Sequence, residues 1–364
     1  MGNTSIQWTA TPRPDGTLAP GYTFNGWIGC HRVSEACKAC YAADHTFARV
    51  SKSRGVPLWG EHAWRHVTSD ANWKKPIQWN REAAAAGERR KVFAHSLSDV
   101  FENRDDLIEP RARLAALVGA TPHLNWLFLT KRPEHAVRLW RQACSESTGR
   151  LPCVCGSHGR SELCGEIDIS TGQWASNIWI GTTTENQAMA EQRLPHLLRV
   201  PAVVKFLSVE PLLEAIDLDP PHCQSCYPSG MDAIVDAEDG TPCCTNCDSE
   251  AAFGWWLDPL NGGISWVIVG GESGPKARPF DVAWARDVVR QCRDAGVPVF
   301  VKQMGSAPCD HGTLGELPTA WPAGTHTAAG YPPRIMLNDR AGGDPEEWPE
   351  DLRMREWPVP GSAQ

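Results

Sequence analysis

The chain has 364 residues, of which 41% are hydrophobic and 21% are charged, and its formal net charge is −8 at pH 7. This composition is typical of a globular protein and excludes a disordered chain. No apolar run approaches the roughly 18 residues of a membrane helix, so we expect no membrane partner. The net negative charge argues against a protein that binds nucleic acid through its overall charge. The first residues carry no basic and apolar stretches of a secretory signal, so we expect a cytoplasmic protein.

Short apolar runs of strand length alternate with amphipathic segments along the chain. The predicted strands are residues 22–28, 92–95, 126–129, 178–181, 203–207, 266–269 and 299–301, and the predicted helices are 109–118, 134–141, 187–198 and 282–295. Nearly continuous apolar strands that alternate with helices indicate a parallel sheet covered on both faces. The predicted fold class is α/β, a complete or partial (β/α) TIM-type barrel, with a doubly wound open sheet as the alternative.

Two stretches rich in cysteine and glycine interrupt this alternation, at residues 144–176 and 218–262. Both are predicted to be insertions between consecutive β/α units. The barrel domain is then expected to span residues 1–306. Residues 307–364 form a C-terminal extension that packs on the barrel, with Trp321, Trp348 and Trp357 as its expected anchors.

Fourteen cysteines without an export signal favour bound metal over a disulfide framework. Cys30, Cys37 and Cys40 follow the first predicted strand with the spacing C-x6-C-x2-C. Three thiolates on one loop suit three irons of a [4Fe–4S] cluster and leave the fourth iron open, which is typical of a reactive metal site. A zinc site with His31 or a distant residue as its fourth ligand explains the spacing equally well.

Two further cysteine groups lie in the predicted insertions. Cys223, Cys226, Cys244 and Cys247 form two C-x2-C pairs with 17 residues between them, which predicts a closed structural zinc site. The insertion is too short for a core of its own, so a metal would supply its folding energy. The second group consists of Cys153, Cys155, His158 and Cys164. It is less regular and is either a second zinc site or a set of unligated thiols.

Polar residues follow most of the predicted strands, where the active groups of a β/α barrel lie. They are Ser98, Asp99, Thr130, Lys131, Arg132, Thr183, Glu185, Ser208, Glu210, Glu272, Ser273, Lys302 and Gln303. We single out Lys131, Glu210 and Glu272 as candidate catalytic residues. Gly270 and Gly271 precede Glu272 and allow a ligand to approach the backbone. The alternative for any of these residues is an ion pair that closes the rim of the barrel.

Basic residues and tryptophans also alternate in one region. Lys74 and Lys75 lie among Trp59, Trp64, Trp73 and Trp79, and Arg89, Arg90 and Lys91 follow shortly afterwards. This combination suits phosphate contacts and base stacking. A solvated face with the tryptophans turned into the core explains it equally well.

The ordered motifs of the chain resemble a known family. They include Ser5-Ile6-Gln7-Trp8-Thr9, the segment 22–41, Asp70-Ala71-Asn72-Trp73, Ser96-Leu97-Ser98-Asp99-Val100-Phe101, Leu129-Thr130-Lys131-Arg132-Pro133, Ser208-Val209-Glu210-Pro211-Leu212, Gly270-Gly271-Glu272-Ser273-Gly274 and Trp348-Pro349-Glu350-Asp351-Leu352. Nearly the whole chain is similar to a three-cysteine-motif family of unknown function that bacteriophages and prophages encode. Cys37-Lys38-Ala39-Cys40-Tyr41 also resembles the cluster loop of radical S-adenosylmethionine (SAM) enzymes, whose usual C-x3-C-x2-C spacing is three residues shorter.

This resemblance implies an iron–sulfur enzyme that uses SAM and an external electron donor to modify or repair a nucleotide or nucleic acid in a bacterial host cell. The Gly-Gly-Glu segment, residues 270–272, would help to bind SAM, although radical SAM enzymes carry a similar segment on an early strand. The alternative is a non-catalytic, zinc-stabilised protein that binds nucleic acid or another partner.

Overall fold

The computed structural model describes residues 4–147, 174–218, 222–223, 234–236, 242–244, 253–254, 256–260, 262–310 and 334–358. The chain divides into two compact units. The first comprises Met1–Thr183 and Val200–Ser208, and the second comprises Thr184–Arg199 and Val209–Gln364. No helix within the described ranges is long and apolar enough to cross a membrane.

The first unit is built on five parallel strands. They are β3 (Tyr22–Phe24), β6 (Arg90–Ala94), β7 (Leu124–Thr130), β8 (Ile178–Thr183) and β9 (Val204–Val209), and each pairs with the next in chain order. The order contains no reversal among these strands, whereas a doubly wound sheet needs one. Together with two parallel strands of the second unit, this confirms the predicted mixed α/β class and is consistent with a partial β/α barrel.

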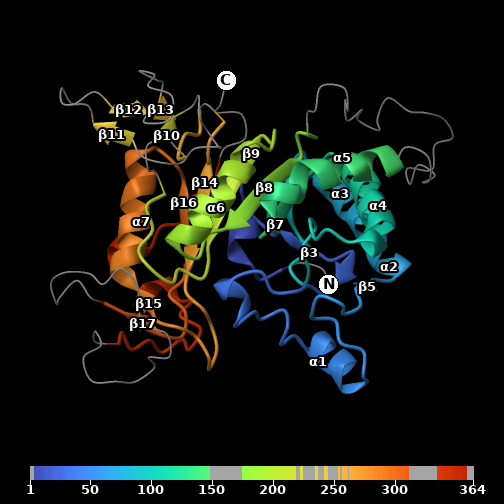
Figure 1. Cartoon of the computed structure of the whole chain (residues 1–364), viewed down its shortest axis with the longest axis horizontal. Coiled ribbons are helices and arrows are strands. Elements are labelled where there is room, and N and C mark those ends of the chain that lie inside the picture. Colours follow the sequence, from blue (N-terminus) through green and yellow to red (C-terminus); the bar gives the residue numbers. More distant parts are fainter. Residues whose placement is uncertain are drawn as a thin grey trace. The chain divides into compact units, whose positions relative to one another are not determined.

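Helices connect these strands: the predicted helices 109–118 and 134–141 are present, and the helix over residues 75–85 was not predicted. α3 (Lys75–Ala85), α4 (Ile108–Gly119) and α5 (Ala136–Ser147) gather on one side of β7 (Figure 1). The predicted strand 22–28 is interrupted, because only β3 joins the parallel sheet and β4 (Trp27–Ile28) pairs elsewhere. Asn25 lies at this break, where its side-chain oxygen accepts a hydrogen bond from the Leu97 N–H at 2.8 Å.

The strands are buried on both faces, which is why they read as continuous apolar runs. Every residue of β8 and β9 is buried. Aromatic side chains fill the space around them: Trp8 meets Phe93 edge-on at 4.8 Å between ring centroids, and Phe24 meets Trp126 at 5.6 Å. The abundance of tryptophan therefore serves mainly the core.

The second unit contains β14 (Trp266–Gly270) and β16 (Val299–Gln303), paired in parallel, with α7 (Val282–Asp294) between them in sequence. α6 (Gln187–Leu198) also belongs to this unit. Cys292 is buried in α7. The Asp281 side chain caps the start of α7 by accepting from the Ala283 N–H at 2.9 Å.

The C-terminal segment packs on β16. The Val301 N–H donates to the Met354 carbonyl at 2.8 Å and the Glu356 N–H donates to the Val299 carbonyl at 3.0 Å, so the segment covers a strand edge. Of the predicted anchors, Trp348 is buried and Trp357 packs on Phe300 at 5.2 Å between ring centroids. Trp321 lies outside the described residues.

The two predicted insertions are described only in part. Trp174 is buried against Trp140, so the chain rejoins the core at once before β8. In the second insertion, β10 (His222–Cys223) pairs with β13 (Phe253–Gly254) and β11 (Ile234–Asp236) pairs with β12 (Pro242–Cys244). The predicted boundary at residue 306 and the role of the insertions stay predictions.

Gly181 provides a test of the core of the first unit. A Cβ added to this β8 residue would lie 2.4 Å from the Phe206 ring, so we expect Gly181→Ala to lower the free energy of unfolding by about 1–3 kcal/mol in urea denaturation. Gly119, near the end of α4, has open space around it, and Gly119→Ala should be neutral or stabilise by up to about 1 kcal/mol. Equal effects of the two substitutions would contradict the packing described here.

Candidate functional site

The three cysteines lie on a closed lobe of the first unit, which we call the cysteine lobe, residues 29–67. It leaves β4 and returns in β5 (His66–Val67), which pairs antiparallel with β4. Gly29 opens the lobe with φ of 119°, and a Cβ added there would lie 2.5 Å from the Leu58 carbonyl oxygen. Glycine is required because the outgoing chain passes directly against the returning chain.

Backbone hydrogen bonds hold Cys30 in place. Its N–H donates to the Leu58 carbonyl at 3.2 Å, and its carbonyl accepts from the Gly60 N–H at 3.0 Å. Cys40 packs on a small apolar cluster that joins the lobe to neighbouring segments of the first unit. The cluster consists of Ile28, Ala42, Leu58 and Leu97. The position of the first and third cysteines is therefore set by the folded lobe and does not depend on a disulfide.

Cys30, Cys37 and Cys40 are all half-buried free thiols. In the part of the chain that the structure describes, no three His, Cys, Asp or Glu side chains are placed to hold a metal ion. The structure thus brings the three cysteines onto one loop, and their assembly around a metal stays a prediction.

Arg132 reaches the thiol of Cys30 from the end of β7. Its Nη1 donates to Cys30 Sγ at 3.7 Å and to Asp99 Oδ2 at 2.8 Å, and its Nη2 donates to the His31 carbonyl at 3.1 Å. Asp99 and Arg132 follow two neighbouring parallel strands, whose carboxyl ends meet at the same edge of a sheet. The sequence predicted both residues as strand-end candidates, and the structure brings them together beside the cysteine lobe.

The Asp99 carboxylate is fully engaged. Its Oδ1 accepts from the Thr130 hydroxyl at 2.7 Å and the Phe101 N–H at 2.9 Å, and its Oδ2 accepts from the Lys131 N–H at 3.0 Å. Burial alone would raise its pKa, but the Arg132 guanidinium and these hydrogen bonds hold the pKa of Asp99 below its usual value. Asp99 therefore carries a negative charge at neutral pH and fixes Arg132.

A second buried ion pair continues from His31. Its Nδ1 lies 2.6 Å from Glu102 Oε1, and Arg65 binds the Glu102 carboxylate with Nε at 2.8 Å and Nη2 at 2.5 Å. Arg65 also donates to the Ala63 and Gly60 carbonyls of the lobe at 2.7 and 3.1 Å. We call Asp99, Arg132, His31, Glu102 and Arg65 the charge network.

Burial, more than the charge network, sets the pKa of the first cysteine. Burial raises the pKa of Cys30 to about 12, and the neighbouring Arg132 opposes this shift without cancelling it. A bare Cys30 thiol is therefore protonated and unreactive at neutral pH. A metal that replaces this proton creates a thiolate, whose negative charge the Arg132 guanidinium then balances.

His95 is a further unusual residue at the end of β6. It is buried with φ of 63°, a strained conformation for a residue with a side chain. Its Nδ1 lies 2.7 Å from the Ser98 hydroxyl, its ring lies 3.9 Å from the Trp27 ring, and its Nε2 has no hydrogen-bond partner in the described structure. Burial lowers the pKa of His95 to about 3, so its imidazole is neutral. From the sequence, His95 was predicted only to be the last residue of a strand.

The strand-end residues of the second unit form separate ion pairs. Lys302 Nζ lies 3.1 Å from Glu210 Oε1, and Arg278 binds Glu272 Oε2 through its backbone N–H at 3.0 Å and its Nε at 2.9 Å. Lys131, in the first unit, donates from Nζ to the Thr183 hydroxyl at 3.1 Å. Both candidate carboxylates therefore already have a cationic partner.

The two glycines of the Gly-Gly-Glu segment lie close to neighbouring atoms. A Cβ on Gly271 would lie 2.4 Å from the Met304 carbonyl oxygen, and a Cβ on Gly270 would lie 2.8 Å from Glu210 Oε1. The Gly271 carbonyl accepts from the Gln303 side-chain amide at 2.8 Å. The close approach of the chain segments after β14 and β16 explains Gly271 without a ligand, whereas a Cβ on Gly270 would meet mainly the end of the Glu210 side chain.

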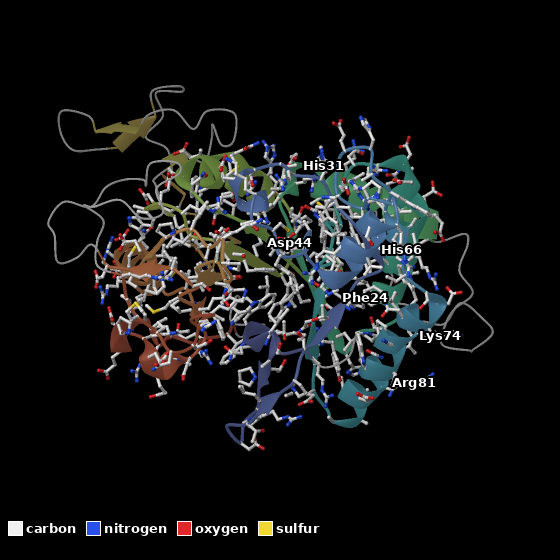
Figure 2. All side chains as sticks on the ribbon, turned by 90° about the horizontal axis from the view of Figure 1, so that it is seen from below. Phe24, His31, Asp44, His66, Lys74 and Arg81 are labelled. Carbon is white, nitrogen blue, oxygen red and sulfur yellow. The ribbon has the colours of Figure 1, made fainter. Side chains whose placement is uncertain are left out.

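The alternation of basic residues and tryptophans divides between surface and core. Trp73 and Trp79 are buried, Trp59 is half-buried and Trp64 is exposed. Lys74 and Arg81 lie on the side of the first unit formed by α2 (Asp70–Trp73) and α3, well away from His31 on the cysteine lobe (Figure 2). Of these four tryptophans, Trp64 is the exposed one and can stack with a ligand.

Most of the predicted zinc ligands lie outside the described residues. This applies to Cys153, Cys155, His158, Cys164, Cys226 and Cys247. The backbones of Cys223 and Cys244 lie on β10 and β12, and their side chains are not described. Structural zinc in the second insertion stays a prediction.

Residues 3–329 match the model of the family described as "Protein of unknown function (DUF5131)". The chain belongs to this family. The match spans both compact units, so the cysteine lobe, the charge network and the Gly-Gly-Glu segment all lie inside the family's extent. Neither a curated protein nor a solved structure matches the chain.

Asp99→Asn tests the charge network. The substitution leaves Arg132 as a buried charge without its counter-ion, so we expect the free energy of unfolding to fall by about 3–5 kcal/mol in urea denaturation. Asp294→Asn removes an exposed partner of Arg290 and should cost less than about 1 kcal/mol.

The same pair predicts a dependence on pH. Because the pKa of Asp99 is lower in the folded than in the unfolded protein, its contribution to stability is complete above the usual aspartate pKa, about 3.9, and is lost as the pH falls below it. The difference in stability between wild type and Asp99→Asn should therefore narrow in acid. A difference that stays constant down to about pH 2 would contradict this assignment.

Proposed function

We propose that this protein is an iron–sulfur enzyme of the radical SAM type, which modifies or repairs a nucleotide or nucleic acid. Cys30, Cys37 and Cys40 are the proposed ligands of a [4Fe–4S] cluster, and the parallel strands are proposed to form a partial β/α barrel around the substrate. The motifs quoted above support a bacteriophage or prophage origin and action in the cytoplasm of the bacterial host. The proposal includes an external electron donor.

The hydrogen bond from Arg132 to Cys30 Sγ is the observation that carries the proposal. Asp99 holds the guanidinium beside a loop thiol. If that sulfur is a negatively charged metal ligand, the guanidinium compensates its charge. The donor set also fits an iron–sulfur cluster in kind, because thiolates are its usual ligands and three on one loop leave one iron open. When bound, such a cluster supplies the electron that cleaves SAM.

The residues of this chain have distinct tasks in the proposal. Arg132 compensates the charge of the sulfur ligands, and Glu102 with Arg65 keeps the lobe in shape around them. Lys131, at the end of β7, offers a cation for the carboxylate of SAM or a substrate phosphate. Glu210 and Glu272 remain the proposed polar residues of the second unit, with Glu272 acting through its ion pair with Arg278.

One observation favours the alternative, a non-catalytic zinc-stabilised binding protein. Histidines that bind zinc usually donate their other ring nitrogen to a carboxylate. His31 Nδ1 is positioned in this way against Glu102, and Nε2, which lies 3.4 Å from Arg132 Nη2, would bind a metal once this guanidinium moved away. His31 together with the three cysteines then forms a closed Cys3His site, which gives a colourless protein without SAM chemistry.

SAM cleavage tests the proposed function. The anaerobically reconstituted and reduced wild-type protein should release 5′-deoxyadenosine from SAM, as measured by chromatography, and Cys37→Ala should release none. Cys292→Ala, in the core of α7, serves as the matched control and should keep the activity. A fully iron-loaded wild-type protein that leaves SAM intact, with an electron paramagnetic resonance spectrum unchanged by SAM, would rule out the radical SAM assignment.

Arg132→Met tests the proposed role of the guanidinium. Removing a positive charge and a hydrogen bond beside a sulfur ligand makes reduction harder, so the midpoint potential should become more negative by on the order of 60 mV, equivalent to about 1.4 kcal/mol for one electron. Arg132→Lys keeps the charge and should shift the potential less. Iron content and circular dichroism verify that each variant is folded and loaded. A potential equal to that of the wild type in Arg132→Met would show that Arg132 serves the fold alone.

A further inference from the structure

Most of the aromatic side chains that the structure describes are buried, and Trp59 and Trp357 are half-buried. Among the aromatic residues whose side chains the structure describes, only Tyr41 and Trp64 are exposed, to 63% and 62%. Both belong to the cysteine lobe. Four valines of the same lobe are also exposed: Val33, Val50, Val56 and Val67. Two exposed rings beside a candidate site, in a protein whose other described aromatic rings are buried or half-buried, indicate a surface that contacts a partner.

The Tyr41 ring and the Trp64 backbone are held next to the cysteines. The Tyr41 hydroxyl donates to the Ser96 carbonyl at 2.8 Å, which fixes the ring. The Trp64 carbonyl accepts from Arg65 Nη1 at 3.4 Å, so the backbone of this residue is tied to the lobe. A base that stacks on the fixed Tyr41 ring costs the protein little side-chain entropy.

The charge of the cysteine lobe is opposite to that of the whole chain. Its 39 residues contain six Lys and Arg against three Asp and Glu, whereas the chain has a net charge of −8. Arg65 is buried and paired with Glu102, so five exposed cations stand against three exposed anions on its surface. Arg32, Lys52 and Arg54 are exposed, and none of them forms an ion pair with another described residue. The lobe is therefore a local basic surface on an acidic protein, which selects an anionic partner.

We infer that the cysteine lobe binds single-stranded nucleic acid, with bases stacked on Tyr41 and Trp64 and phosphates contacted by Arg32, Lys52 and Arg54. Flat exposed rings with interspersed cations match a chain that offers accessible base faces and regularly spaced phosphates. A duplex hides its base faces, and an acidic peptide offers charge without rings to stack. The inference rests on the nucleic-acid part of the proposed function and names its substrate class, but it does not depend on the metal.

Fluorescence anisotropy with a labelled oligothymidine of about 12 nucleotides tests this surface on the full-length, iron-loaded protein. Trp64→Ala and Tyr41→Ala should each weaken binding by about 5- to 150-fold, the range that corresponds to base stacking. Lys52→Gln and Arg54→Gln should each reduce the slope of log K against log salt by about 0.7. Leu18→Ala and Arg81→Gln, both exposed outside the lobe, are the matched controls and should bind like the wild type.

Three results would overturn the inference: binding unaffected by Trp64→Ala and Tyr41→Ala, tighter binding to duplex than to single strands, or equal competition by polyglutamate. Iron content and SAM cleavage are measured on the same preparations. A protein that cleaves SAM but binds no oligonucleotide refutes the surface and leaves the enzyme assignment standing. A protein that binds the oligonucleotide through Trp64 but takes up no iron on reconstitution supports the surface and refutes the iron–sulfur assignment.

Discussion

The buried ion pair between Asp99 and Arg132 is the interaction on which the candidate site depends. It joins the chain segments that follow β6 and β7, and its guanidinium extends to Cys30 and to the His31 carbonyl. Both side chains are almost fully buried, so each charge would be strongly destabilising without the other. A buried pair of this kind contributes little net stability compared with apolar residues. We propose that the contact of Arg132 with the Cys30 thiol gives this pair a functional role in addition to its structural one.

The cysteine lobe combines rigid and accessible parts. Its base is closed by the pairing of β4 with β5, and Arg65 ties its carbonyl groups to Glu102. Its outer surface carries half-buried thiols, exposed rings and unpaired cations. The backbone is therefore held in place while the reactive and binding groups remain reachable, which is the arrangement that a metal site with an open position requires.

The strands and most helices could be predicted because burial on both faces leaves continuous apolar runs, as in β8 and β9. Asp99, Thr130 and Arg132 could be predicted as site residues because they follow strand ends. Glu102 and Arg65 could not, since a charged loop residue gives no sign in sequence that it is buried against a partner 37 positions away. Likewise, sequence alone could not separate Trp64 on the surface from Trp73 and Trp79 in the core.

The most direct test of the central claim is the identity of the metal on the cysteine lobe. Iron, zinc and acid-labile sulfide are measured in protein purified without oxygen, for the wild type and for Cys40→Ser. The account predicts about four irons and four sulfides per chain in the wild type and their joint loss in Cys40→Ser. Any zinc bound by the second insertion should be unaffected. Wild-type protein that contains no sulfide and loses zinc in Cys40→Ser would contradict the account and establish the zinc-stabilised alternative.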